Sequence, residues 1–140
     1  MRKLGIDYGD ARVGIAITDA LNITVQGLET IHHQGNDKIV LKRLEELLAQ
    51  YEIDTFVIGM PINMNGTKTE RVEVTEKFIH KCRCRFPKIK IETIDERLTT
   101  VAAHKTMNFL NVNKNKKRNI VDTISAVYIL ETYMKKCENS

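Results

Sequence analysis

The N-terminal part of the chain alternates bulky apolar residues with small or polar ones, which predicts β-strands. Residues 12–19 place Val and Ile at every second position, with Gly, Ala and Thr between them. This period of two describes a strand with one bulky and one small face. The preceding apolar segment, Lys3–Asp7, is close enough to pair with it as a hairpin through the turn Gly9–Ala11. A third strand around Leu28–His32 would complete an antiparallel meander.

The central part of the chain alternates between helix and strand patterns. Asp37–Tyr51 carries apolar residues at three- and four-residue spacing, which predicts an amphipathic helix. Thr55–Met60 is a continuous apolar run, typical of a parallel strand that is covered on both faces. Thr67 with Glu70 forms a capping box, which predicts the start of a helix that continues to about Arg85.

The C-terminal part is predicted to contain one strand and two helices. Lys88–Ile94 alternates polar and apolar residues, as in a strand near a sheet edge. Either Thr99 or Thr100 can cap the helix that follows. After the polar stretch Asn111–Asn119, a last helix carries apolar residues at helical spacing, namely Ile120, Ile124, Val127 and Met134.

The order of these elements, β-β-β-α-β-α-β-α-α, predicts the fold class. We expect one α/β domain over residues 1–140, built on a mixed five-stranded sheet that helices flank. Three strands form the antiparallel meander and two are parallel, because helical crossovers connect them.

Composition adds limits on function and location. Hydrophobic residues make up 42% of the chain and charged residues 29%, which is typical of a globular protein. The net charge of +4 favours a polyanionic partner without identifying one. The three cysteines lack the spacing of a zinc site, and no apolar run is long enough to span a bilayer. We therefore expect a cytoplasmic protein with reduced thiols and no membrane partner.

Acidic residues at the predicted strand ends are candidate metal ligands. Asp7 closes the first strand, Asp95 and Glu96 close the last one, and Asp122 lies early in the final helix. Ligands of open α/β sheets gather at the carboxyl ends of the strands, so these side chains can converge there. Oxygen-only clusters suit Mg²⁺ or Mn²⁺, and two such ions can stabilise the attacking and leaving oxygens of phosphodiester hydrolysis.

Each of these acids also has a purely structural interpretation. Asp7 can hydrogen-bond the turn that follows it, and Asp122 can oppose the dipole at the start of the last helix. Asp95 and Glu96 can pair with Arg97 or face solvent. Only their combination favours a metal site.

Four segments resemble, in order, the motifs of one protein family. Leu4–Gly9 followed by Arg12–Ala16 is similar to the first motif of the YqgF family, also called RuvX. Its members are described as Holliday-junction resolvases and as pre-16S rRNA nucleases. Ile58–Gly66 resembles the family's GLPLNMDG stretch, Asp95–Thr100 its DERLTT motif and Lys117–Asp122 its KRKxxVD motif. The resemblance covers essentially the whole chain.

The resemblance implies a ribonuclease H-like fold, a Mg²⁺ or Mn²⁺ cofactor and a structured DNA or RNA substrate. It implies that Asp7, one acid of the pair Asp95 and Glu96, and Asp122 bind the metal and are catalytic. Strand alternation puts the two acids of that pair on opposite faces, so one is expected to reach the metal, and Asp95 is preferred. Asn65 stands where the family commonly has Asp, a difference that bears on substrate preference more than on chemistry.

Basic residues near the acids are candidate nucleic-acid contacts. Arg12 and Arg97 each carry a guanidinium that can grip two phosphate oxygens, and each can equally be the ion-pair partner of a neighbouring acid. Four basic residues that precede Asp122 can steer a nucleic-acid backbone towards the metal or form a solvated loop: Lys114, Lys116, Lys117 and Arg118. The histidines lack metal-ligand spacing and are expected at the surface: His32, His33, His80 and His104.

Two other classes of function stay open at this point. A nucleotide-binding phosphotransferase of the actin and sugar-kinase type also begins with an Asp-x-Gly hairpin, but it needs two such domains to enclose ATP. A nucleic-acid-binding or assembly factor would keep the fold and lack cleavage with Mg²⁺ or Mn²⁺. For a nuclease, both a DNA junction and an rRNA precursor fit as substrate. A monomer and a homodimer both fit as well, and symmetric cutting of a two-fold junction calls for the dimer.

Overall fold

A five-stranded mixed sheet with the strand order β3-β2-β1-β4-β5 forms the centre of the molecule. In the computed structural model, residues 1–62, 70–98 and 114–139 are described, and for residues 114–121 only the backbone is described. The strands are β1 (Arg2–Tyr8), β2 (Arg12–Thr18), β3 (Val25–His32), β4 (Ile53–Met60) and β5 (Lys90–Asp95). Strands β1, β2 and β3 pair in antiparallel fashion, whereas β1, β4 and β5 pair in parallel. The predicted α/β class and sheet composition are therefore confirmed.

The last strand begins later than the polar and apolar alternation predicted. Its first residue is Lys90, not Lys88. The amide of Ile89 donates to the carbonyl of Phe86 at 3.0 Å, so the chain is still turning there after the preceding helix. Alternation alone does not reveal that turn, because a turn next to a strand can have the same pattern of polar and apolar residues.

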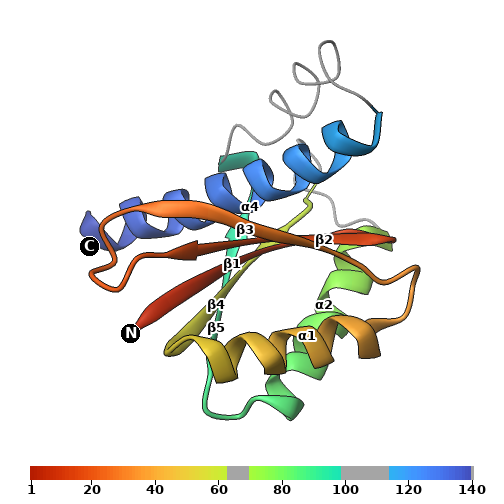
Figure 1. Ribbon diagram of the computed structural model, residues 1–140, viewed down its shortest axis with the longest axis horizontal. Helices are drawn as coiled ribbons and strands as arrows, with labels where there is room; N and C mark the ends of the chain where they lie inside the picture. The colour runs from red at the N-terminus through yellow and green to blue at the C-terminus, as the bar shows by residue number, and fades with distance from the viewer. Residues whose placement is uncertain (63–69, 99–113, 140) are drawn as a thin grey trace.

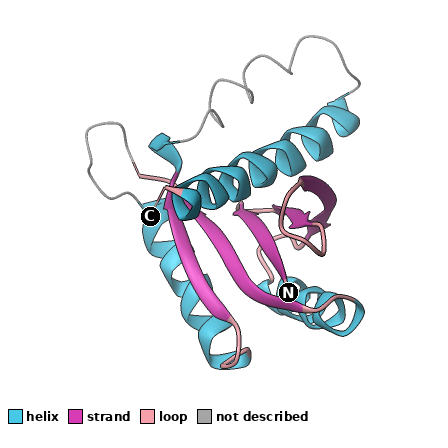
Figure 2. Ribbon diagram, turned by 90° about the vertical axis from the view of Figure 1, so that its left-hand side faces the viewer, coloured by secondary structure: helices cyan, strands magenta, loops and turns pink. Residues whose placement is uncertain are grey.

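Helices cover both faces of the sheet (Figure 1). Helix α1 (Asp37–Gln50) and helix α2 (Glu70–Arg85) lie on one face, and the long helix α4 (Lys114–Glu138) lies across the other (Figure 2). A short 3₁₀ turn, η1 (Glu96–Leu98), follows β5 directly. The predicted cap at Thr67 and the helix expected from Thr99 or Thr100 lie outside the described residues.

Helix α4 begins earlier than the sequence predicted. The polar stretch that ends at Asn119 was expected to be a loop, but the helix already begins at Lys114. The reason is that Lys and Arg are good helix formers and Asn is only moderately unfavourable, so polarity alone does not exclude helix. Asp122 consequently lies more than two turns inside the helix and not in its first turn.

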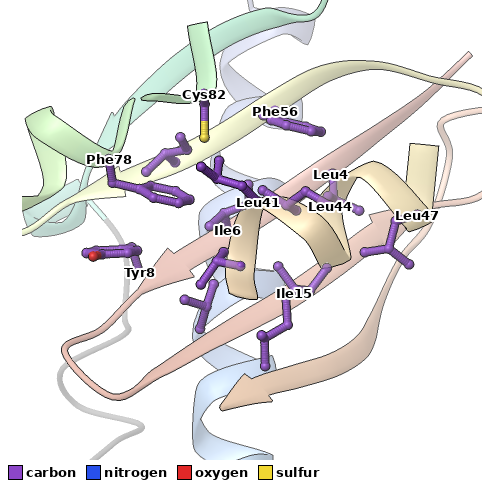
Figure 3. Packing of buried hydrophobic residues seen from close by; sticks show 14 of the residues in the cluster. Leu4, Ile6, Tyr8, Ile15, Leu41, Leu44, Leu47, Phe56, Phe78 and Cys82 are labelled. Atoms are coloured by element: carbon purple, nitrogen blue, oxygen red, sulfur yellow. The ribbon is translucent and has the colours of Figure 1, made fainter. Parts of the chain in front are cut away.

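The two faces of the sheet are packed differently. On the face of α1 and α2, large side chains form the main core, including Leu44, Phe56 and Phe78, each with no exposed surface (Figure 3). On the face of α4, the core is smaller and includes Ala16 and Ala126. This core also contains larger side chains such as Ile129 and Leu130, and α4 comes closest to the sheet where it meets glycines of β1 and β2.

Among the described helices, none combines the length and the apolar character that a bilayer-spanning segment requires.

Candidate active site

Glycines on the sheet bring the backbone of α4 into contact with the strands. A Cβ added at Gly14 of β2 would lie 2.0 Å from the carbonyl oxygen of Asp122 and 3.0 Å from its Cβ. A Cβ added at Gly5 of β1 would lie 2.7 Å from the carbonyl oxygen of Ala126. No side chain larger than hydrogen fits at either position with the helix in its present place, so these glycines set the height of α4 above the sheet.

The same contact brings Asp122 to the carboxyl end of β1. Asp7 is the cross-strand partner of Gly14, so Asp122 lies over the strand position next to Asp7. Asp7 is buried, with 6% of its surface exposed. A cavity of about 310 Å³ opens here, and its lining consists of Asp7, Gly9, Asp10, Ala11, Arg12, Arg71 and Asp122. Two of the acids that the sequence singled out thus share one cavity, although they are far apart in the chain.

Two charged residues of this cavity were missed by the sequence analysis. Asp10 lies in the turn between β1 and β2, where an Asp is ordinarily a turn former. Arg71 lies in the first turn of α2, the helix that follows β4, and its side chain is exposed. The rule that ligands gather at the carboxyl ends of strands could have indicated Arg71, because the helix after such a strand begins at that edge.

Arg12 forms an ion pair across the cavity. Its Nε donates to Oδ2 of Asp122 at 2.9 Å, and both side chains are largely buried. Of the two interpretations of Arg12, the ion pair with an acid is therefore observed. The guanidinium nevertheless lines the cavity, where a phosphate group can reach it.

Asp95, the acid preferred from the sequence, is engaged by Arg97. The Nη2 and Nε atoms of Arg97 donate to Oδ2 of Asp95 at 2.6 and 2.9 Å, and the Arg97 amide donates to Oδ1 at 2.9 Å. These hydrogen bonds from Arg97 hold the pKa of Asp95 below its usual range. Asp95 and Arg97 thus close a small loop that has Glu96 between them.

Glu96 lies on the face of the sheet that α4 covers. Its Oε1 is 2.9 Å from the position that a Cβ would take at Gly59 of β4, where the side chain of Ile129 of α4 also packs. Ile94 of β5 belongs to the core on the same face, under α4. Asp95, the next residue of β5, points to the other face, because side chains alternate along a strand.

The carboxylate of Glu96 therefore lies over β4, the strand next to β1, on the same face of the sheet as Asp7. Gly59 follows Ile58, which pairs with Ile6, the residue before Asp7. The cavity around Asp7 does not include Glu96 in its lining, so Glu96 stands beside it, over the next strand. The geometry distinguishes the two consecutive acids, Asp95 and Glu96, in a way that the sequence did not.

Two acids of the cavity, Asp7 and Asp122, could hold a metal ion together with water and a substrate phosphate. Within residues 1–62, 70–98 and 114–139, no three acidic, His or Cys side chains form a ready metal-binding group. Mg²⁺, however, is commonly bound by one or two carboxylates together with water and substrate phosphates. Asp7 and Asp122 on one cavity satisfy that requirement, and their oxygen donors suit a hard cation.

The basic run before Asp122 forms the first turns of α4. The backbone is helical from Lys114, so Lys116, Lys117 and Arg118 extend along the helix and do not form a solvated loop. Because the effect of the helix dipole fades within the first turn, the dipole does not account for Asp122.

One histidine contradicts the surface position expected for all four. His33 is 1% exposed, whereas His32 and His80 are exposed and His104 lies outside the described residues. Its ring contacts the carbonyl of Gly9, in the turn that borders the cavity. Cys82, Cys84 and Cys137, all among the described residues, form no disulfide with one another.

Comparison with known proteins gives consistent results for sequence and fold. The family model described as "RuvX: Holliday junction resolvase" matches residues 1–136. A protein of Ruminiclostridium cellulolyticum named "Putative pre-16S rRNA nuclease" is 51% identical over 136 residues, which are 97% of this chain and 95% of that protein. A protein of the same name from Acetivibrio thermocellus is 48% identical over 134 residues, covering 96% of this chain and 95% of the relative.

Solved structures with a similar fold include RuvC of Thermus thermophilus in complex with a Holliday junction substrate. Its TM-score is 0.59 at 12% identity, and the match covers 97% of this chain and 96% of that one. The fowlpox virus Holliday junction resolvase has a TM-score of 0.53 at 15% identity, covering 97% and 99% of the two chains. These neighbours confirm the predicted ribonuclease H-like fold.

Proposed function

Because this chain belongs to the RuvX family, we propose that it is a metal-dependent endonuclease that hydrolyses phosphodiester bonds in structured nucleic acid. The names of its family and relatives already indicate a nuclease. The relatives that match nearly end to end are named for pre-16S rRNA, and the family for Holliday junctions. We favour the rRNA precursor, and with it a cytoplasmic site of action, because those relatives are about half identical to this chain.

One observation carries this proposal: three carboxylates and two arginines share a cavity at the carboxyl edge of the sheet. Asp7 and Asp122 supply oxygen donors for a cation, while Arg12 and Arg71 supply guanidinium groups for phosphate oxygens. Both kinds of group suit phosphodiester hydrolysis, because carboxylates can bind the cation and guanidinium groups can bind the negatively charged phosphate.

In this proposal, Asp7 and Asp122 hold Mg²⁺ or Mn²⁺, and Glu96 replaces Asp95 as the third acid. Glu96 is supported by its place on the same face as Asp7, beside Gly59. When bound, the cation polarises the phosphoryl oxygens and favours ionisation of the attacking water. Asp7 contributes a buried carboxylate whose strand position is fixed by pairing with β2.

The remaining charged residues orient the substrate and the acids. Arg12 and Arg71 bind phosphate groups that enter the cavity. The hydrogen bond from Arg12 Nε to Asp122 holds the Arg12 side chain in place. Asp95 and Arg97 brace the turn that carries Glu96, so their role is to position it.

The basic residues at the start of α4 extend the proposed nucleic-acid contact away from the cavity. We assign this role to Lys114, Lys116, Lys117 and Arg118. One active site, and hence a monomer, suffices for a single cut in an rRNA precursor, whereas symmetric resolution of a junction requires a homodimer.

The test is cleavage of labelled rRNA precursors and four-way DNA junctions with Mn²⁺ or Mg²⁺. We expect the native protein to cut one of these substrates, and Asp7→Asn to lose cleavage while it still binds nucleic acid. Asp54→Asn is the matched control, because Asp54 is a partly exposed acid that pairs with Lys3 outside the cavity.

Near-normal cleavage by Asp7→Asn would defeat the metal mechanism. Binding without any cleavage by the native protein would instead favour the non-catalytic assembly factor. ATP binding would favour the phosphotransferase.

A further inference from the structure

A buried histidine connects the turn at the active site to the hydrophobic core. His33 follows β3 in the chain, and its ring contacts the turn between β1 and β2, residues Gly9–Ala11. We propose that His33 is a positioning residue that holds this turn, and with it Asp10 and Arg12, in the place that cleavage requires. This inference rests on the proposed nuclease function of the same cavity.

The hydrogen bonds of His33 define which ring nitrogen carries the proton. The amide of Gly35 donates to Nδ1 at 3.1 Å, and Nε2 lies 2.8 Å from the carbonyl oxygen of Gly9. An amide only donates and a carbonyl only accepts, so Nδ1 is unprotonated and Nε2 donates its proton to Gly9. Both nitrogens of the neutral ring are satisfied, as burial demands.

Aromatic stacking fixes the plane of the His33 ring. Tyr8 stacks on His33 with ring centroids 5.7 Å apart and on Phe78 with centroids 4.3 Å apart, each at an interplanar angle of 18°. The Tyr8 hydroxyl donates to Oδ1 of Asp37 at 2.5 Å, and Lys81 donates to Oδ2 of the same residue at 2.9 Å. The stack therefore connects His33 to both α1 and α2, and Figure 3 shows Tyr8 beside Phe78.

The turn is held at two carbonyl groups. The backbone amides of His33 and Gln34 donate to the Ala11 carbonyl at 2.9 and 3.3 Å, while the His33 ring takes the Gly9 carbonyl. Within the turn, the amide of Gly9 donates to the carbonyl of Arg12 at 2.9 Å. A side-chain substitution at position 33 removes the ring contact and leaves the backbone contacts, so the contribution of the ring can be isolated.

Two substitutions separate the two ring nitrogens. In His33→Gln, the side-chain amide nitrogen reaches about as far as Nε2 and can still donate to the Gly9 carbonyl. In His33→Asn, the side-chain oxygen replaces Nδ1 for Gly35, but the amide nitrogen is too short to reach Gly9. Both variants lose the stacking on Tyr8, so each controls for that loss in the other.

We expect His33→Asn to lower kcat for cleavage by about tenfold to a hundredfold, since misplacing a catalytic constellation by about 1 Å has effects of that order. His33→Gln should stay within about threefold of the native rate, because one hydrogen bond to Gly9 is restored. The affinity for nucleic acid without divalent metal should differ little between the two variants. A defect in kcat with unchanged binding, rescued by Gln, is not expected of a general loss of stability.

A second measurement does not depend on cleavage. Hydrogen exchange of the Gly9 amide, which bonds to Arg12, should be faster in metal-free His33→Asn than in His33→Gln or the native protein. If the native protein cuts nothing, the proposed function fails and the exchange rates still test the role of His33. Equal exchange in the two variants overturns the inference. Faster exchange in His33→Asn with equal cleavage overturns the claim that the turn must be positioned for catalysis.

Discussion

The two faces of the sheet differ in how their helices are packed, and we infer that they contribute differently to stability and to the active site. Under α1 and α2, large side chains such as Leu44 and Phe56 fill the space between helix and strand. Under α4, Gly5 and Gly14 let the helix backbone meet the strands directly. Large flexible side chains can adjust to a substitution, whereas two backbones in contact cannot. The first face therefore provides stability, and the second determines the distance between acids from opposite ends of the chain.

The largest expected effect is on the stability of the face packed by α1 and α2. Leu44→Ala removes a fully buried side chain from the main core. It should lower the free energy of unfolding by about 2–5 kcal/mol, measured by urea titration. Cleavage per folded molecule should change little, since Leu44 does not line the cavity. A large loss of cleavage in fully folded Leu44→Ala would contradict the inference that this face provides stability and not the geometry of the active site.

The face under α4 should show the opposite behaviour. Gly14→Ala puts a methyl group where the Asp122 carbonyl now lies, so α4 has to move. Cleavage should fall by about a hundredfold because the acids are displaced, while the far-ultraviolet circular dichroism of the folded protein remains.

Gly27→Ala is the matched control for Gly14→Ala. Its added Cβ would be 3.1 Å from the Cβ of Thr123, a side-chain atom of the same helix and not its backbone. We expect a change in cleavage of less than about tenfold, since a shift of a few tenths of an ångström relieves this contact. Equal losses in the two glycine variants would show that the height of α4 is not what matters.

The consecutive acids Asp95 and Glu96 allow the two faces of the sheet to be compared at a single place in the chain. Glu96 lies on the face of α4, and Asp95 is held by Arg97. Glu96→Gln should reduce cleavage about tenfold more than Asp95→Asn does, because loss of a supporting residue generally costs less than loss of a ligand. Single-turnover rates with saturating Mn²⁺ provide the measurement. The reverse order of the two effects would return the metal-binding role to Asp95.

The smallest expected effect is the pH dependence of the Asp95–Arg97 pair. Hydrogen bonding to Arg97 lowers the pKa of Asp95 from its ordinary value of 3.8. The pair therefore stabilises the folded state above pH 3.8, and this contribution disappears as the pH falls through the lower pKa of the folded protein. Because the pair is near the surface, Asp95→Asn should cost less than about 1 kcal/mol at pH 7.

Urea titrations of Asp95→Asn and the native protein at several pH values test this linkage. The difference between the two proteins should be constant at neutral pH and shrink only in acid. A difference that instead grew in acid would mean that the carboxylate destabilises the fold.

Much of the fold follows from the chain itself, because side-chain periodicity is a local property. The alternation in residues 12–19 reflects a strand whose small face receives α4, and the apolar run in β4 reflects a strand covered on both sides. Local pattern failed at the start of α4, where Lys and Arg are compatible with both loop and helix. It also failed for His33, whose burial depends on a turn more than twenty residues away in the sequence.

The sequence by itself determined the chain order of the described strands and helices, the position of Asp7 near a strand end and the family resemblance. Only the tertiary structure brought Asp122 over Gly14, added Arg71 to the cavity and distinguished Glu96 from Asp95. The physical reason is that periodicity acts over a few residues, whereas the meeting of two carboxylates depends on how closely a helix approaches a sheet. That approach is decided by the absence of side-chain atoms at a few glycines, which a pattern of polar and apolar residues does not record.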